Sequence, residues 1–97
     1  MTSSREYQVG DLVRSLTGRD RLKYYLVWSV GDSRLELVDG QTRRIENPKR
    51  KNPKHVGFLG RNAEELARKL AAGTGPSNLE VRKTIAELVS SLGEDQE

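Results

Sequence analysis

The pattern of apolar residues changes character near residue 60, and this change limits the folds that the chain can adopt. Before it, short apolar runs alternate with turn residues at the close spacing typical of antiparallel strands. After it, apolar residues recur at the three- and four-residue spacing of amphipathic helices. Ninety-seven residues with 34% apolar side chains amount to one small domain, or one small domain with an appendage.

The first part of the chain predicts several short strands separated by glycine-containing turns. The clearest is residues 24–30, where aromatic and β-branched side chains predominate. Many short strands at close spacing favour a small antiparallel β-barrel. The expected strands are residues 12–15, 24–30, 34–38, 41–45 and 55–58.

Two connections carry specific turn signals. Asp39 and Gly40 tolerate positive φ, so they predict a tight hairpin that returns the chain as a strand over residues 41–45. The prolines after Asn47 and Asn52 push each asparagine out of the helical region, which predicts an open basic loop between them.

The second part of the chain predicts two helices. Asn62 and Ser77 each precede a glutamate by three residues, which is the spacing of a capping box at a helix start. Gly73 and Gly93 stand where glycine commonly ends a helix. The apolar stripes are Ala63, Leu66, Ala67 and Leu70 in the first helix, and Val81, Ile85, Leu88, Val89 and Leu92 in the second.

Composition excludes several classes of function. The chain has no cysteine and one histidine, His55, so disulfides, zinc sites and histidine-dependent triads are not expected. No set of nucleophile, base and orienting residue is apparent, and we expect neither catalysis nor a cofactor or metal. Asp20 is expected to form a turn. The polar N-terminus lacks a signal peptide and no apolar run is long enough for a membrane span, which predicts a cytoplasmic protein.

Charge is distributed unevenly along the chain. The net charge is +3, but residues 1–60 carry +5 and residues 61–97 carry −2. Clustered lysine and arginine are typical of surfaces that bind the phosphates of nucleic acids. The candidate RNA-binding basic residues are Arg19, Arg21, Lys23, Arg43, Arg44, Lys49, Arg50, Lys51, Lys54 and His55.

Residues 9–27 resemble a KOW motif, which consists of a strand, a loop of glycine and basic residues, and a second strand. Gly10 precedes the first strand, residues 18–21 form the loop, and Val27 is the apolar anchor of the second strand. Residues 43–56 also resemble KOW proteins related to large-subunit ribosomal proteins of archaea and eukaryotes. The tail, including residues 77–83, is similar to the extension on their bacterial relatives.

The resemblance implies a small SH3-like antiparallel barrel followed by two short C-terminal helices. It further implies an RNA-binding protein of translation that docks on ribosomal RNA of the large subunit. The chain departs from the pattern at Leu22, where KOW motifs usually have glycine, and at Tyr25, where a small residue is common. The loss of glycine alters how closely the backbone can approach RNA.

The motif places Val27 on the inside of the barrel. Strand alternation then places Leu26 and Trp28 on the outside, where the helices of residues 62–92 can cover them. We therefore expect Trp28 to anchor the helices and Tyr24, beside the basic loop, to stack on an RNA base.

These observations predict four segments: a flexible tail (1–7), the KOW barrel (8–60), a two-helix extension (61–93) and a frayed end (94–97). The expected partner is RNA, and in particular ribosomal RNA or the ribosome. No association with membranes is expected, and the free protein is expected to be a monomer. The alternative is an SH3-like protein-interaction module of the transcription or translation machinery. In that case the barrel would bind a peptide. Val81, Ile85 and Leu88 would be the partner surface only if the helices do not pack on the barrel, which the sequence leaves open.

Overall fold

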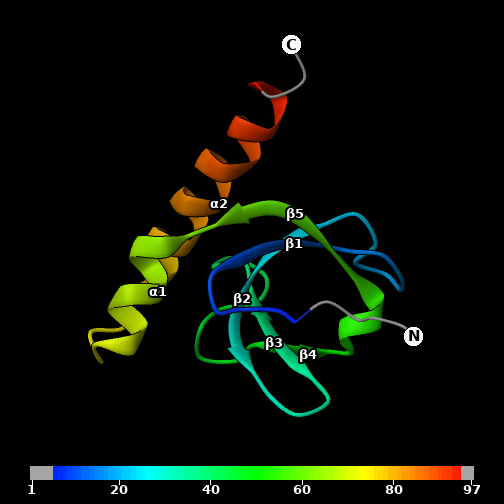
Figure 1. Cartoon of the computed structure of the whole chain (residues 1–97), viewed down its shortest axis with the longest axis horizontal. Helices are drawn as coiled ribbons and strands as arrows, with labels where there is room; N and C mark the ends of the chain where they lie inside the picture. Colours follow the sequence, from blue (N-terminus) through cyan, green and yellow to red (C-terminus); the bar gives the residue numbers. More distant parts are fainter. Residues whose placement is uncertain (1–5, 95–97) are drawn as a thin grey trace.

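The structure is a computed structural model that describes residues 6–94 and combines one antiparallel sheet with two helices. The five strands lie in the order β4-β3-β2-β1-β5 (Figure 1). The strands are β1 (Asp11–Ser15), β2 (Tyr24–Val30), β3 (Leu35–Val38), β4 (Lys49–Lys51) and β5 (Val56–Asn62). The two helices are α1 (Glu64–Ala71) and α2 (Asn78–Glu94), and a short 3-10 turn, η1 (Pro53–His55), precedes β5.

The sheet curls, and its register is broken twice. One irregularity lies between Asp11 and Val13 in the pairing of β1 with β5, and another between Val27 and Ser29 in the pairing of β2 with β3. Such irregularities bend a strand and increase its twist. Figure 1 shows the curled strands on one side and the two helices on the other. The sheet is not closed into a barrel, and β4 and β5 are its edges.

The inner face of the curled sheet carries one apolar cluster. Val27 and its neighbours from four strands are almost completely buried there without help from either helix. A sheet that curls around its own side chains can bury a face that no helix covers. The buried members of this inner cluster are Val13, Tyr25, Val27, Leu35, Leu37 and Val56.

The outer face of the sheet carries a second cluster, which the helices cover. Leu26 of β2 is fully buried here, and Trp28 packs against the same cluster. Leu66 of α1 and Val81 of α2 belong to the same cluster and cover its sheet residues. The predicted placement of Val27 inside and of Leu26 and Trp28 beneath the helices is therefore confirmed. The buried members of this outer cluster are Leu12, Leu26, Val38, Ala63, Leu66 and Val81.

The predicted hairpin and strand over residues 41–45 are wrong. Asp39 Oδ1 accepts hydrogen bonds from the backbone N–H groups of Gln41 and Arg43, and Asp39 Oδ2 accepts one from the Thr42 hydroxyl. The Asp39 and Gly40 N–H groups then donate to the Arg43 carbonyl oxygen. The side chain of Asp39 thus folds the next four residues into a turn that cannot pair with β3.

Residues 49–51 form an edge strand, although the two prolines predicted an open loop. Lys49, Arg50 and Lys51 pair with Leu37, Glu36 and Leu35 of β3. Proline is tolerated beside an edge strand because that strand leaves one set of backbone groups unpaired. The basic segment is therefore part of the sheet.

The start of α1 differs from the prediction and the start of α2 agrees with it. Asn62 belongs to β5, and its amide donates to the Val9 carbonyl and to Asp11 Oδ1, so it does not cap α1. Ala63 takes the N-cap position without a side-chain hydrogen bond. Ser77 Oγ, as expected, accepts a hydrogen bond of 3.1 Å from the Glu80 N–H at the start of α2.

The helix ends also divide between agreement and correction. Gly73, with φ of +81°, donates its N–H to the Leu70 carbonyl beyond the end of α1, as predicted for a terminal glycine. Gly93 lies inside α2, so the prediction that it ends the helix is wrong. With 17 residues, α2 is not short.

Contacts at both ends hold α2 on the sheet. Near its start, Asn78 Oδ1 accepts the Ile45 N–H at 2.8 Å, and Gly40 packs against the Asn78 carbonyl oxygen. Near its end, the Arg61 guanidinium donates to Ser91 Oγ at 2.8 Å. The orientation of α2 is thereby fixed relative to the turn that Asp39 organises.

The expected terminal segments fall largely outside the described residues. Within the expected tail of residues 1–7, Tyr7 packs against the inner cluster, and its hydroxyl donates to the Val56 carbonyl at 3.2 Å. Of the expected end 94–97, the structure describes only Glu94, where α2 ends.

Candidate functional site

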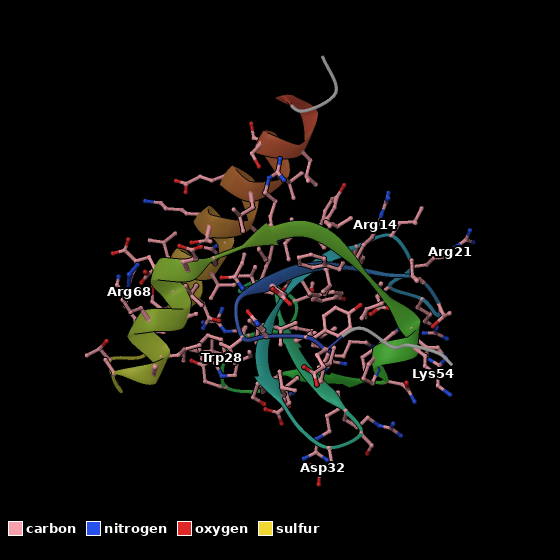
Figure 2. The ribbon with its side chains drawn as sticks, in the orientation of Figure 1. Arg14, Arg21, Trp28, Asp32, Lys54 and Arg68 are labelled. Carbon is pink, nitrogen blue, oxygen red and sulfur yellow. The ribbon has the colours of Figure 1, made fainter. Side chains whose placement is uncertain are left out.

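The loop between β1 and β2 and the turn η1 lie side by side at one end of the sheet. The Leu16 N–H donates to the His55 carbonyl at 2.9 Å, which joins the two segments. Figure 2 shows Arg21 and Lys54 at this end, on the side of the molecule opposite Arg68 of α1. Apart from Lys23, which lines a cleft described below, the exposed basic residues of the two segments define what we call the basic end: Arg19, Arg21, Lys54 and His55.

Two further predicted cations lie behind the basic end and are already paired. Lys51 Nζ is 3.2 Å from Asp20 Oδ1 and also donates to the Thr17 carbonyl at 2.9 Å. Lys49 Nζ is 3.4 Å from Asp20 Oδ2. The Lys51 side chain is only 10% exposed. These two lysines tie the β1–β2 loop to β4, and Lys51 has little surface to offer a ligand.

Asp20 is therefore the centre of a buried network, beyond the turn role expected for it. The hydroxyls of Ser15 and Tyr25 donate to its two carboxylate oxygens at 3.0 and 3.2 Å. Burial alone raises the pKa of Asp20, but hydrogen bonds from Lys51 and Ser15, with the charges of the lysines, lower it to about 2. Burial and the charge of Asp20 raise the pKa of the Tyr25 hydroxyl. We call these residues the Asp20 network: Ser15, Asp20, Tyr25, Lys49 and Lys51.

Three other predicted cations lie elsewhere. Arg50 points to the opposite face of β4 from its lysine neighbours, and its Nε is 3.8 Å from Glu36 Oε2. Arg44 Nε is 3.6 Å from Glu46 Oε1 in the loop beside α2. Arg43, in the same loop, is half-buried. The long basic segment is thus divided among several surfaces.

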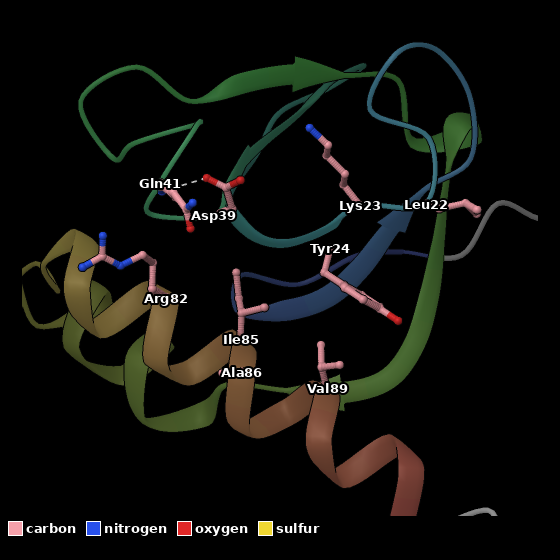
Figure 3. Close-up of a pocket in the computed structure, with 9 residues that line it drawn as sticks. All are labelled: Leu22, Lys23, Tyr24, Asp39, Gln41, Arg82, Ile85, Ala86 and Val89. Carbon is pink, nitrogen blue, oxygen red and sulfur yellow. Dashed lines mark hydrogen bonds between the residues drawn. The ribbon is translucent and has the colours of Figure 1, made fainter.

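Lys23 and Tyr24 line a cleft of about 510 Å³ between the β1–β2 loop, the Asp39 turn and α2 (Figure 3). We call it the α2 cleft. Ile85 and Val89 of α2 supply its apolar wall, and Figure 3 shows Arg82 on the side away from Lys23. Two residues predicted to bind RNA thus line the cleft: Lys23 is the last residue of the β1–β2 loop and Tyr24 is the first residue of β2.

Sequence reasoning missed the residues that complete this cleft, namely Arg82, Gln41 and Asp39. A signal for Arg82 was present, because residues 82, 85, 86 and 89 share one helical face with the apolar stripe of α2. The contribution of Asp39 and Gln41 depends on the turn that replaces the expected strand, and residue spacing does not reveal it.

A scan against protein-family models and a search of curated proteins find no match to the chain. The resemblance to the KOW motif accordingly stays a prediction. Among residues 6–94, no group of three or more histidine or carboxylate side chains could hold a metal ion. Neither α1 nor α2 has the length and apolar character that crossing a membrane requires.

Proposed function

We propose that the chain binds structured RNA through the basic end, as a cytoplasmic protein of translation that docks on ribosomal RNA of the large subunit. One observation carries the proposal. Exposed cations from the β1–β2 loop and from η1, which are 33 residues apart at Arg21 and Lys54, lie at the same end of the sheet. Arg19, Arg21 and Lys54 there present long cationic side chains to solvent.

The chemistry of this end suits recognition of phosphates and of RNA shape. Cations on exposed loops can reach a folded RNA backbone and release its counterions, without reading individual bases. The Asp20 network supports the same role from behind, because it fixes the β1–β2 loop on β4 and limits the freedom that binding would remove. We propose binding and no catalysis at this site.

The fold is consistent with the proposed family. We propose that the curled sheet is an incompletely closed SH3-like barrel, since it wraps around an inner cluster and has its register broken twice. Leu22, which stands where KOW motifs usually have glycine, has a φ of +72°. That position keeps a backbone conformation that favours glycine. Tyr25, the other departure, uses its hydroxyl in the Asp20 network.

One form of the protein-interaction alternative used the second helical stripe as the partner surface, on condition that the helices do not pack on the barrel. Val81 is fully buried, and Ile85 and Leu88 pack against the outer cluster. The helical stripe is therefore largely used within the chain, which disfavours that form of the alternative; peptide binding by the sheet itself stays an alternative.

The test compares two triple variants with the same change of charge. Changing Arg19, Arg21 and Lys54 to serine removes the basic end. Changing Arg34, Arg68 and Lys83, which are exposed cations outside it, is the matched control. Affinity for a fluorescent RNA hairpin from the large subunit is titrated between about 50 and 200 mM KCl.

Three phosphate contacts give a log–log salt slope of about −2 to −3 for the wild type and the control. The basic-end variant should bind more weakly, with a clearly shallower slope. Equal losses in both variants, or no binding by the wild type at low salt, would contradict the proposal. Crosslinking in cells would then show whether the bound RNA is ribosomal.

A further inference from the structure

The α2 cleft is a second surface, and the phosphate contacts proposed for the basic end do not involve it. Its volume of about 510 Å³ lies within the range of small-ligand sites. Its wall includes the ring of Tyr24 and the side chains of Ile85 and Val89. The cleft therefore offers apolar and aromatic contact on a protein whose proposed ligand is strongly charged.

Cations stand on both sides of this apolar wall. Lys23 and Arg82 are exposed and lie on opposite sides of the cleft (Figure 3). Asp39 is the only acid among the described lining residues, and its carboxylate already accepts three hydrogen bonds from its own turn. An apolar wall between two cations is complementary to a flat base flanked by phosphates.

Two other side chains add features that favour a nucleotide over a simple apolar group. The Arg14 guanidinium lies 5.6 Å from the centre of the Tyr24 ring, which holds that ring in a cation–π contact. Gln41 is exposed at the cleft and carries both a donor and an acceptor, which can pair with the edge of a base.

The cleft adjoins the basic end along the β1–β2 loop. Arg21 and Lys23 lie two residues apart on the same loop, with Leu22 between them at the rim. The Leu22 side chain is 51% exposed despite its positive φ. An RNA strand on the basic end can therefore continue into the cleft without crossing an acidic surface of this loop.

We propose that the α2 cleft takes one unpaired nucleotide of the bound RNA, with its base against Tyr24 and its flanking phosphates at Lys23 and Arg82. This inference rests on the proposed function and extends it, because it assigns single-stranded RNA to the cleft and structured RNA to the basic end. The protein then prefers a folded RNA that presents an unpaired nucleotide beside a helix.

The first experiment maps two RNA probes on the full chain by amide chemical shifts. The probes are single-stranded hexauridylate and a short RNA duplex with the same number of phosphates. Hexauridylate should shift the amides of Gln41, Ala86 and Val89, and the duplex should shift only those of the basic end. A synthetic acidic peptide containing leucines serves as the competing probe, and shifts at the cleft with the peptide alone would overturn the inference in favour of a protein partner.

The second experiment fills the cleft without changing its charge. Ala86 is exposed and lines the cleft, so Ala86→Gln should weaken hexauridylate binding at least about fivefold, as expected when one stacked base is lost. Ser90→Gln places the same side chain on the exposed surface of α2 outside the cleft and should change nothing. Duplex binding should be the same in both variants.

The outcomes separate this inference from the proposed function. RNA could shift the amides of the basic end while those of the cleft do not move, or Ala86→Gln could bind hexauridylate as tightly as the wild type. Either result would overturn the inference and leave the proposed function standing. No response of any amide to either RNA would overturn both.

Discussion

Asp20 and Asp39 each organise one loop of the sheet, but they do so with different partners. Asp20 accepts hydrogen bonds from side chains on β1, β2 and β4, including a lysine 31 residues away. The hydrogen bonds that the Asp39 carboxylate accepts come from its own turn, from Gln41, Thr42 and Arg43. The first arrangement joins distant strands, whereas the second shapes one short turn.

The difference shows how one kind of side chain can stabilise a fold at two scales. The Asp20 network balances buried charge, so its contribution depends on every partner being present. The Asp39 turn contributes little charge balance, but it sets the surface on which α2 docks through Gly40 and Asn78. The two regions should therefore respond differently to substitution.

The largest effect is expected from Asp20→Ala. This change leaves Lys51 buried without its counter-charge, and we expect the free energy of unfolding to fall by about 3–5 kcal/mol. Asp39→Ala, the same change in the other loop, should lower it by about 1–2 kcal/mol, as for loss of a capping side chain. Urea unfolding measures both variants, with the exposed Asp32→Ala as a neutral control.

A double-mutant cycle sharpens this prediction. Adding Lys51→Met to Asp20→Ala removes the unpaired charge, so the double variant should be more stable than Asp20→Ala alone. Equal costs for the two aspartates, or strict additivity in the cycle, would remove the contrast between the two loops.

The second largest effect is expected from Gly40→Ala. A methyl group at this position overlaps the Asn78 carbonyl oxygen, and the backbone has a φ of +76°. Strain and overpacking together should lower the free energy of unfolding by about 2–4 kcal/mol. Gly60→Ala is the matched control, because φ is +78° there and nothing lies within 4 Å of the added carbon. An equal loss in both variants would show that α2 does not press on the Asp39 turn.

Acid should weaken the Asp20 network. The pKa of Asp20 is about 2 in the folded protein against an ordinary value of 3.8, so folding favours its ionised form. The contribution of Asp20 to the free energy of unfolding is about 2 kcal/mol at neutral pH. It is lost as the pH falls from about 5 to 2, because the carboxylate is then protonated in both the unfolded and the folded protein.

The measurement is the free energy of unfolding at a series of acidic pH values. Asp39 and Glu46, whose pKa values are also lowered, contribute to the same decline. The difference between wild type and Asp20→Asn isolates Asp20, and the variant should show the shallower decline. Parallel curves for the two proteins would contradict the assigned pKa of Asp20.

The smallest effect is expected from Leu22→Gly in the loop that Asp20 anchors. Glycine relieves the strain of a positive φ but adds freedom to the unfolded chain, so the net gain in unfolding free energy should be at most about 1 kcal/mol. Leu16→Gly is the matched control, since Leu16 is also exposed but its φ is not positive, and it should lose stability. A loss at both positions would show that Leu22 is not strained.

The sequence predicted the features that depend on local periodicity. Alternation along residues 24–30 separated Val27 from Leu26 and Trp28, and helical spacing located α1 and α2. The capping role of Ser77 was also predictable, because a capping box lies within four residues.

The features that were missed depend on which partner captures a polar side chain. Asn62 has the spacing of a helix cap, but its amide binds Asp11 more than 50 residues away. Asp39 resembles a hairpin residue, but its carboxylate folds the turn that excludes a strand. For the site, spacing identified the cations of the basic end, whereas the pairing of Lys49 and Lys51 with Asp20 depends on the register of β4.

The position of β1 between β2 and β5 has a consequence for the synthesis of the chain. Its pairing joins Asp11 to Asn62, so the first strand made cannot complete its hydrogen bonds until the last strand has been made. A nascent chain that ends before β5 therefore exposes an open strand edge and lacks Val56 of the inner cluster. The sheet cannot be completed until β5 has been translated, and products truncated before it are expected to aggregate.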